Sequence, residues 1–119
     1  MADQLVWFKR DLRVADHAPL NAAIAAGPVR PVYVIEPGLW AQPDSAQRHW
    51  AVIKDGLAEL QVALSELGLE LLVLNGSLPA IFAELHAKVP FAAIHSHQET
   101  GNAWSYARDR AVADWWRTA

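Results

Sequence analysis

Charged side chains are concentrated directly after the first apolar run of the chain. Lys9, Arg10, Asp11 and Arg13 follow the run at residues 4–8. A short apolar run of this kind is typical of a buried strand, which would deliver these side chains to its carboxyl end. Ligands of open parallel α/β sheets bind in the crevice outside the carboxyl ends of the strands. The opening residues therefore predict a polar site at one edge of a sheet.

Later apolar runs are followed by side chains of the same kinds. Glu36 comes directly after the run at residues 29–35, and His97 and Glu99 come shortly after the fourth run. Arg48 stands near the start of a long helical pattern and can face the same edge. Together these loops would form a polar crevice where the strand order reverses, which is the usual ligand site of such folds.

Ion pairing within the protein is the alternative to ligand binding for these charges. Asp11 and Arg13 from the first loop can pair with Arg108 and Asp109 from the last helical pattern and tie the loop to the helix. We expect this structural role for all four residues. Ligand contact and ion pairing both stay open for three others: Arg10, Arg48 and Glu99.

The sequence lacks the motifs of several common binding sites and catalytic sites. The first run is not followed by a Gly-x-Gly-x-x-Gly fingerprint, and no phosphate-binding Gly-Lys-Ser/Thr loop occurs. The absence of cysteine excludes disulfides, thiolate metal sites and a cysteine nucleophile. His95 and His97 can share one face of a strand, but no third metal ligand is evident, and Ser96 lacks the glycines of a nucleophile elbow. We therefore expect a binding domain with no catalytic residue and no metal site.

The composition is that of one globular domain. The 119 residues are 53% hydrophobic and 19% charged, which provides apolar material for a single core. The formal net charge of -3 does not fit a chain that binds nucleic acid through its own cationic surface. The first residues lack the layout of a signal peptide, and no apolar run is long enough to span a bilayer. Since cysteine is absent too, we expect a cytoplasmic chain with no membrane partner.

The elements that would position the site alternate along the chain. Four apolar runs predict strands that are buried on both faces, at residues 4–8, 29–35, 70–74 and 91–95. Helical patterns cover residues 17–26, residues 45–67, a segment that begins after Ser77, and a segment from about Asn102 to the end. This order predicts a doubly wound, Rossmann-like α/β fold, with a parallel sheet of four to five strands, right-handed crossovers and flanking helices.

The longest helical pattern has the clearest apolar stripe. Its members recur at steps of three and four residues: Trp50, Ile53, Leu57, Leu60, Leu64 and Leu67. Asp16 and Ser77 are the predicted N-caps of the first and third helices. A fifth strand would be the natural element after the last helix, so we expect the chain to be a fragment.

Two segments resemble signatures of the DNA photolyase/cryptochrome family. Residues 6–13, Val-Trp-Phe-Lys-Arg-Asp-Leu-Arg, with Asp16 and Leu20 beyond them, resemble the amino-terminal signature of that family. Residues 97–109, His-Gln-Glu-Thr-Gly-Asn-Ala-Trp-Ser-Tyr-Ala-Arg-Asp, resemble its segment after the fourth strand. The similarity covers essentially the whole chain. One departure is visible, because the family usually has asparagine where His17 stands here.

The resemblance implies that residues 1–119 form the amino-terminal antenna domain of a larger protein. In that family the domain holds a second chromophore, commonly a reduced folate, a deazaflavin, FMN or a lumazine, and a helical domain binds FAD. The FAD-binding domain would be absent from this chain, which alone is not expected to be catalytic. The full-length parent would be a deoxyribodipyrimidine photo-lyase, whose antenna passes excitation to FAD for blue-light-driven repair of pyrimidine dimers. Its partners would be its own FAD domain and UV-damaged DNA.

The same resemblance, carried over by position, implies the contacts of the antenna chromophore. They are Arg10, Tyr33, Ile35, Glu36, Arg48 and Glu99. Arg10 and Arg48 would stack on the ring or hold a charged tail, and Glu99 would accept hydrogen bonds from ring N–H groups. Three alternatives stay open: a blue-light photoreceptor cryptochrome without repair activity, a standalone nucleotide-binding α/β module, and an inert scaffold that has lost its chromophore. The missing glycine-rich loop argues against the nucleotide-binding module.

Overall fold

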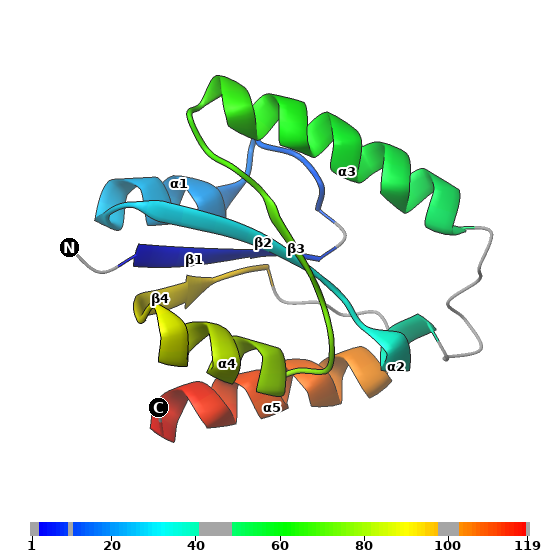
Figure 1. Cartoon of the computed structure of the whole chain (residues 1–119), viewed down its shortest axis with the longest axis vertical. Helices are drawn as coiled ribbons and strands as arrows, with labels where there is room; N and C mark the ends of the chain where they lie inside the picture. The colour runs from blue at the N-terminus through cyan, green and yellow to red at the C-terminus, as the bar shows by residue number, and fades with distance from the viewer. Residues whose placement is uncertain (1–2, 10, 41–48, 98–102, 119) are drawn as a thin grey trace.

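A parallel sheet with helices on both faces forms the body of the protein (Figure 1). The computed structural model describes residues 3–9, 11–40, 49–97 and 103–118. In this part of the chain four strands pair in the order β3-β2-β1-β4: β1 (Asp3–Phe8), β2 (Val29–Ile35), β3 (Leu72–Asn75) and β4 (Phe91–His95). The helices are α1 (Ala18–Ala26), α2 (Pro37–Trp40), α3 (His49–Glu66), α4 (Ala80–Lys88) and α5 (Ala103–Thr118). The predicted doubly wound α/β fold is confirmed.

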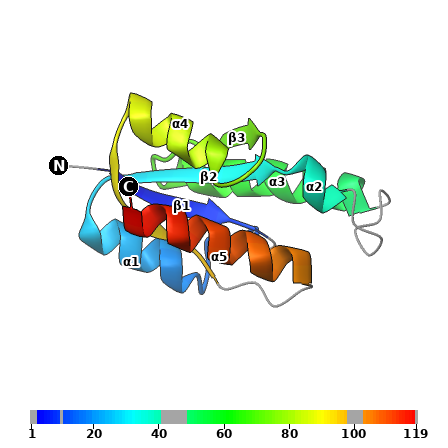
Figure 2. The same cartoon turned by 90° about the horizontal axis from the view of Figure 1, so that it is seen from below.

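The central strand β1 is buried on both faces, as its apolar run predicts. Its side chains alternate: Leu5 and Trp7 pack with the side chains of α4 and α5, whereas Val6 and Phe8 pack with those of α1 and α3. Figure 1 shows these two helix layers on opposite sides of the sheet, and Figure 2 shows α5 in front of the sheet from below. Each face of the sheet therefore has its own apolar core.

The strands β3 and β4 are the edges of the described sheet and are less buried than predicted. β3 pairs only with β2, and β4 pairs only with β1, among the residues described. Val73 of β3 is 48% exposed. The expectation that all four strands are buried on both faces was wrong for these two, because each has a neighbouring strand on one side alone in the described part of the chain.

The described side chains of helix α3 confirm the predicted apolar stripe except at its end, while the side chain of Trp50 lies outside the described residues. Leu57, Leu60 and Leu64 are buried in the core beneath α1 and α3. The helix ends one residue before Leu67, and Gly68 follows with a φ of 76°. This left-handed residue turns the chain away from the helix axis, so Leu67 is 52% exposed and the prediction for it was wrong.

The N-caps of α1 and α4 differ from the predicted ones. Asp16 has a φ of 51°, which is not the extended conformation that an N-cap needs, and the next residue, His17, caps α1 instead. At α4 the N-cap is Pro79, and the predicted cap Ser77 offers its backbone carbonyl to the N–H of Ile81 at 3.0 Å. Both corrections move the start of the helix toward the carboxyl end of the chain.

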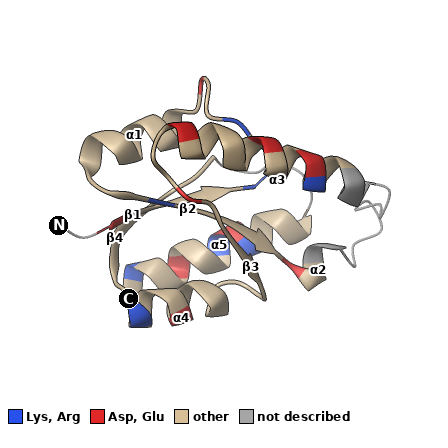
Figure 3. Ribbon diagram, turned by 45° about the horizontal axis from the view of Figure 1, so that its top comes forward, with Lys and Arg blue, Asp and Glu red and all other residues tan. Residues whose placement is uncertain are grey.

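Charged residues are distributed unevenly over the helices (Figure 3). Acidic and basic positions occur along α3, whereas α1 carries none. No helix in the described part of the chain combines the length and the apolar character that a membrane crossing requires.

Candidate functional site

The carboxyl ends of β1 and β4 meet at the point where the strand order reverses. Such a switch point is the usual place for a ligand in an open α/β sheet. Lys9, directly after β1, joins the elements here: its Nζ donates to the His97 carbonyl at 2.6 Å and pairs with the Asp109 carboxylate at 3.1 Å. The ammonium also lies 4.3 Å from the centre of the Trp7 ring. Lys9 therefore fixes α5 against the ends of β1 and β4.

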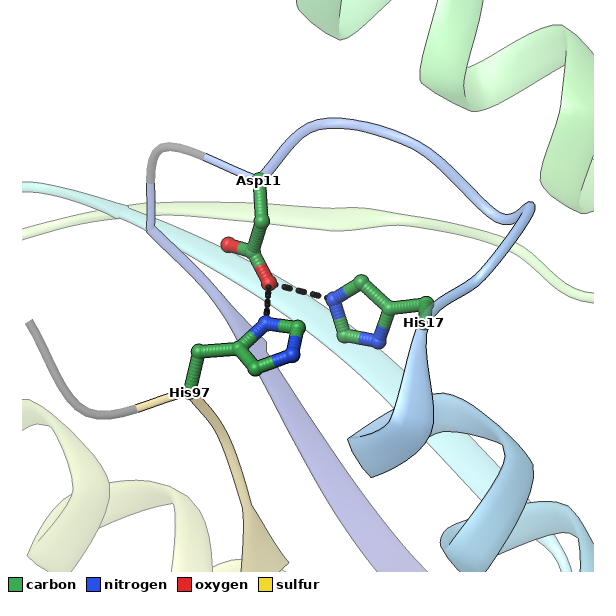
Figure 4. Close-up of side chains that lie close together, drawn as sticks. All are labelled: Asp11, His17 and His97. Atoms are coloured by element: carbon green, nitrogen blue, oxygen red, sulfur yellow. Dashed lines mark hydrogen bonds and ion pairs between the residues drawn. The ribbon is translucent and has the colours of Figure 1, made fainter.

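Asp11, His17 and His97 form a second polar group at this edge, which we name the Asp11 cluster (Figure 4). The Oδ2 atom of Asp11 lies within hydrogen-bond distance of His17 Nε2 and 2.7 Å from His97 Nδ1. The Oδ1 atom accepts the backbone N–H of Lys9 at 3.0 Å. His17 caps α1, because its Nδ1 accepts the Leu20 N–H at 3.0 Å. The cluster thus joins the loop after β1, the start of α1 and the end of β4.

Burial and hydrogen bonds set the protonation of the Asp11 cluster. Burial lowers the pKa of His17; Asp11 partly offsets this effect, and electrostatic interactions with His97 and Arg13 add to it. Burial alone would raise the pKa of Asp11, but hydrogen bonds from the Lys9 backbone and His97, together with the charge of His17, lower it. Near neutral pH, Asp11 is therefore ionised and His17 is neutral.

Glu36, directly after β2, forms a buried ion pair with Arg108 of α5, and each side chain is 4% exposed. Arg108 also donates from Nε to Asp109 Oδ1 at 2.8 Å. Its guanidinium carbon lies 4.9 Å from the centre of the Trp7 ring and 5.5 Å from that of Trp104. Two carboxylates and two indole rings therefore hold this guanidinium in one orientation.

A small cavity opens beside the Glu36–Arg108 pair. Its volume is about 260 Å³, and its lining comes from the end of β2, from α2, from the β3–α4 connection and from α5: Glu36, Gly38, Ser77, Leu78, Trp104, Ala107 and Arg108. Gly38 is required for this shape, because a Cβ atom at that position would lie 2.8 Å from the Trp104 ring. The cavity borders a carboxylate, a guanidinium and an indole ring, which are groups that recognise a planar polar ligand.

A wider groove of about 400 Å³ runs along β4 and α5. Its lining mixes aromatic, aliphatic and charged side chains: Trp7, Lys9, Ile94, Ser96, Tyr106, Asp109, Arg110, Val112, Ala113 and Trp116. Arg108 of the small cavity bonds to Asp109, and Asp109 pairs with Lys9. One charged network therefore borders both hollows.

Three of the six predicted chromophore contacts lie in the described part of the chain. Tyr33 is buried in the core beneath α1 and α3, and Ile35 packs against that core. Glu36 pairs with α5, which covers the opposite face. The alternation along β2 thus divides these residues between the two faces of the sheet. The other three lie outside the described residues: Arg10, Arg48 and Glu99. All six remain predictions.

The predicted link between the first loop and the last helix exists and includes the predicted Asp109, but its partner in the first loop is Lys9. Lys9 makes the ion pair with Asp109. Asp11 instead bonds to the two histidines of its cluster, Arg13 donates to carbonyls of its own loop, and Arg108 pairs with the glutamate after β2. The prediction was wrong for Asp11 and Arg13, because the loop runs toward the start of α1 while α5 covers the opposite face.

The contact between His17 and His97 is not predicted by spacing within either segment, because the two residues belong to opposite ends of the chain. The other histidine of that strand end, His95, bonds to Gln4 across the β1–β4 pair at 2.8 Å. One signal was present in the sequence: Asp11 and His17 follow the first strand, and His97 follows the fourth. Neighbouring parallel strands deliver such residues to the same edge.

The fold and the switch-point geometry define an open, doubly wound α/β domain with polar side chains at the carboxyl edge of its sheet. A family model described as DNA photolyase matches residues 4–119. The deoxyribodipyrimidine photo-lyase of Salmonella typhimurium is 43% identical over 74 residues, which are 60% of this chain and 16% of that protein. A cryptochrome DASH of Natronomonas pharaonis is 32% identical over 102 residues, which are 81% of this chain and 22% of that protein. The chain belongs to the DNA photolyase family.

Solved structures of the family superpose closely on this fold. A class III photolyase from Agrobacterium tumefaciens matches with a TM-score of 0.83 at 30% identity, over 98% of this chain and 24% of that one. An archaeal photolyase from Sulfolobus tokodaii, described with two FAD molecules and the implication of a novel light-harvesting cofactor, matches with a TM-score of 0.85 at 26% identity, over 98% of this chain and 27% of that one. The chain thus spans about a quarter of these two proteins.

Proposed function

We propose that this chain is the light-harvesting domain of a photolyase-family protein. It binds a second chromophore at the carboxyl edge of its sheet, and the excitation passes to FAD held elsewhere in the full-length protein. That FAD drives the repair of pyrimidine dimers in UV-damaged DNA. The chromophore is a reduced folate, a deazaflavin, FMN or a lumazine.

One observation carries this proposal: Glu36, Trp104 and Arg108 line a cavity at the carboxyl end of β2. A conjugated ring needs an apolar slot and a few polar groups in fixed positions. The cavity volume of about 260 Å³ lies below the roughly 300–1,000 Å³ of pockets that enclose a whole ligand. The residues present therefore fit a ring system and not an entire dinucleotide. The protein would bind and orient the ring, while the bound chromophore supplies the absorption of light.

The relatives support the light-harvesting role. They are compatible with two uses of the excited FAD, which are DNA repair and photoreception. The archaeal neighbour is described as holding two FAD molecules, with the implication of a novel light-harvesting cofactor. Photo-lyases among the relatives support repair. A photoreceptor role is the second candidate, because Cryptochrome-1 of Sinapis alba is 42% identical over 73 residues, which are 60% of this chain.

Binding of a chromophore to the purified chain tests the first part of the proposal. Each of the four chromophore classes is titrated while its fluorescence is followed, with wild type and with Trp104→Leu. We expect one class to bind, and loss of the indole to weaken its affinity about tenfold. Tyr106→Leu is the matched control, since Tyr106 is also on α5 but lines the other groove. Equal effects of the two substitutions, or no binding by any class, would refute the assignment of this cavity.

Repair is tested with the full-length protein that carries this domain. A dimer-containing oligonucleotide is illuminated with blue light, and the restored bases are quantified by chromatography. Loss of dimers that depends on light supports the repair role. Photoreduction of FAD without any loss of dimers would instead support the photoreceptor.

A further inference from the structure

The Asp11 cluster joins two distant segments through one carboxylate (Figure 4). Asp11 Oδ2 contacts both His17 Nε2 and His97 Nδ1, and the side chain of Asp11 is 11% exposed. The His17 side chain is fully buried, whereas that of His97 is 40% exposed. A carboxylate that receives several N–H donors at a buried position holds its partners in a defined arrangement.

The hydrogen bonds of His17 determine where its proton lies. Its Nδ1 accepts the backbone N–H of Leu20, so this nitrogen carries no proton. The single proton of the neutral ring is therefore on Nε2, which donates it to Asp11. His97 faces the same oxygen with Nδ1 and donates from there. Asp11 is the common acceptor of the cluster, and His17 is both a cap and a donor.

These residue types also occur in metal sites, and their nearest ligand atoms all lie within 4.8 Å of one another. A metal at His17 Nε2 would force the ring proton onto Nδ1, where it would face the Leu20 N–H and end the capping of α1. His97 Nδ1 and Asp11 Oδ2 lie 2.7 Å apart, whereas two ligands of a tetrahedral zinc ion lie about 3.3 Å apart. The geometry therefore favours a hydrogen-bonded cluster over a metal site.

We propose that Asp11, His17 and His97 form a proton-operated lock, which positions the loop after β1 against the end of β4 and opens when His17 is protonated. Its three members are positioning residues for the ligand site at this edge. In the sequence, Arg10 precedes Asp11, and Glu99 follows His97 by two positions. Two predicted chromophore contacts are thus neighbours of lock residues in the sequence. The effect on the chromophore rests on the proposed function, whereas the lock itself does not.

Protonation opens the lock because a cationic imidazole has donors on both nitrogens. Its new proton on Nδ1 would face the Leu20 N–H, so α1 would lose its cap. Among the described residues, the ionisable groups facing His17 are Asp11 and Arg13 of the loop and His97 after β4. Helix α1 has no ionisable side chain, and β1 presents the Phe8 ring, whose centre lies 4.8 Å from that of His17.

The direction of the pH dependence follows from the pKa of His17, which burial lowers in the folded state. The unfolded chain, with an ordinary histidine pKa of about 6.5, binds a proton first as the pH falls. The contribution of His17 to stability is therefore complete above about pH 6.5 and decreases below it. The pKa of Asp11 is also lowered on folding, so its contribution is lost only in more acidic solution, below about pH 4.

Urea unfolding of wild type and His17→Asn tests the lock. Asparagine can accept the Leu20 N–H and donate to Asp11, but it does not titrate in this range. Between about pH 7.5 and about pH 5, we expect the unfolding equilibrium constant of wild type to rise up to about thirtyfold more than that of His17→Asn. His95→Gln is the matched control, because His95 bonds to an amide, and this variant should follow wild type. Parallel pH profiles for wild type and His17→Asn would overturn the proposal.

Two measurements on wild type keep the test independent of how the variants fold. Nitrogen NMR should show the Nε2–H tautomer of His17 near neutral pH, and the Nδ1–H tautomer would overturn the lock. Zinc chloride at an equimolar concentration should leave the melting temperature unchanged. A rise in melting temperature that disappears in His97→Ala would overturn the lock in favour of a metal site.

Binding of FMN, one of the four chromophore classes, is the probe that separates the lock from the proposed function. If the lock positions the site, the dissociation constant of wild type rises between about pH 7.5 and about pH 5, while that of His17→Asn rises less. Equal pH dependence in the two proteins would overturn the positioning role. If the NMR and unfolding results hold but none of the chromophore classes binds at any pH, the lock stands and the light-harvesting function fails.

Discussion

A single side chain, Arg108, contacts two carboxylates at the carboxyl edge and the rings of two tryptophans. It pairs with Glu36, bonds to Asp109, and faces the rings of Trp7 and Trp104. A guanidinium this deeply buried keeps its charge, so it needs carboxylates around it. The same groups that stabilise Arg108 would give a bound ring a fixed electrostatic environment.

Glu36→Gln tests the buried ion pair. The substitution keeps the size of the side chain but removes the charge that compensates Arg108, so we expect a loss of about 3 kcal/mol in the free energy of unfolding. Urea denaturation measures the change. Glu59→Gln on the exposed surface of α3 is the control and should have almost no effect. An equal, small effect of the two substitutions would show that the pair does not stabilise the fold.

At the scale of elements, α2 and α5 approach each other closely beside the small cavity. A Cβ atom at Gly38 would meet the Trp104 ring at 2.8 Å, so this approach requires glycine. The contact sets the position of the indole ring, and through it the shape of the cavity. The short helix α2 is thus part of the wall of the site.

Gly38→Ala should disturb both stability and binding. The added methyl group must displace the ring of Trp104, at a cost of about 1–3 kcal/mol in the free energy of unfolding. We also expect weaker binding of the chromophore in a fluorescence titration, because the cavity changes shape. Gly76→Ala is the matched control. A Cβ atom at that position would lie 3.4 Å from the Ile81 side chain, which is an ordinary van der Waals contact, so this variant should be disturbed less. Unchanged stability and affinity in Gly38→Ala would contradict the role given to this glycine.

Helix α3 gives a second prediction at this scale. Leu60 is 1% exposed in the core, whereas Val62, two residues along the same helix, is 60% exposed. Leu60→Ala should destabilise the protein by about 3 kcal/mol through lost burial and the cavity left behind, and Val62→Ala should change stability little. Thermal unfolding of both variants measures the difference. Similar melting temperatures would mean that α3 does not pack as described.

At the scale of the whole molecule, periodic patterns predicted much of the fold. β2 and β4 begin and end as their apolar runs indicate, and the stripe through Leu57, Leu60 and Leu64 marks the buried side of α3. The predictions were wrong where the local sequence pattern does not determine the backbone conformation or the end of a helix. Asp16 is a good N-cap by residue type, yet its positive φ excludes it from that role. Leu67 continues the stripe in sequence but lies beyond the end of the helix.

The site was less predictable than the fold, because its contacts join residues that are far apart in the sequence. The sequence places Glu36 after a strand and Arg108 on a helix, but their pairing depends on how α5 crosses the sheet. The Asp11 cluster likewise combines residues from both ends of the chain. Side-chain partners across such distances follow from strand order, which the alternation of elements alone leaves open.

The action spectrum of FAD photoreduction in the full-length protein tests the light-harvesting role most directly. It applies equally to a repair enzyme and to a photoreceptor, because both excite FAD. We expect more photoreduction than FAD absorption explains at the wavelengths where the second chromophore absorbs, and we expect Trp104→Leu to remove this excess. An action spectrum that coincides with the absorption of FAD alone would contradict the proposed function.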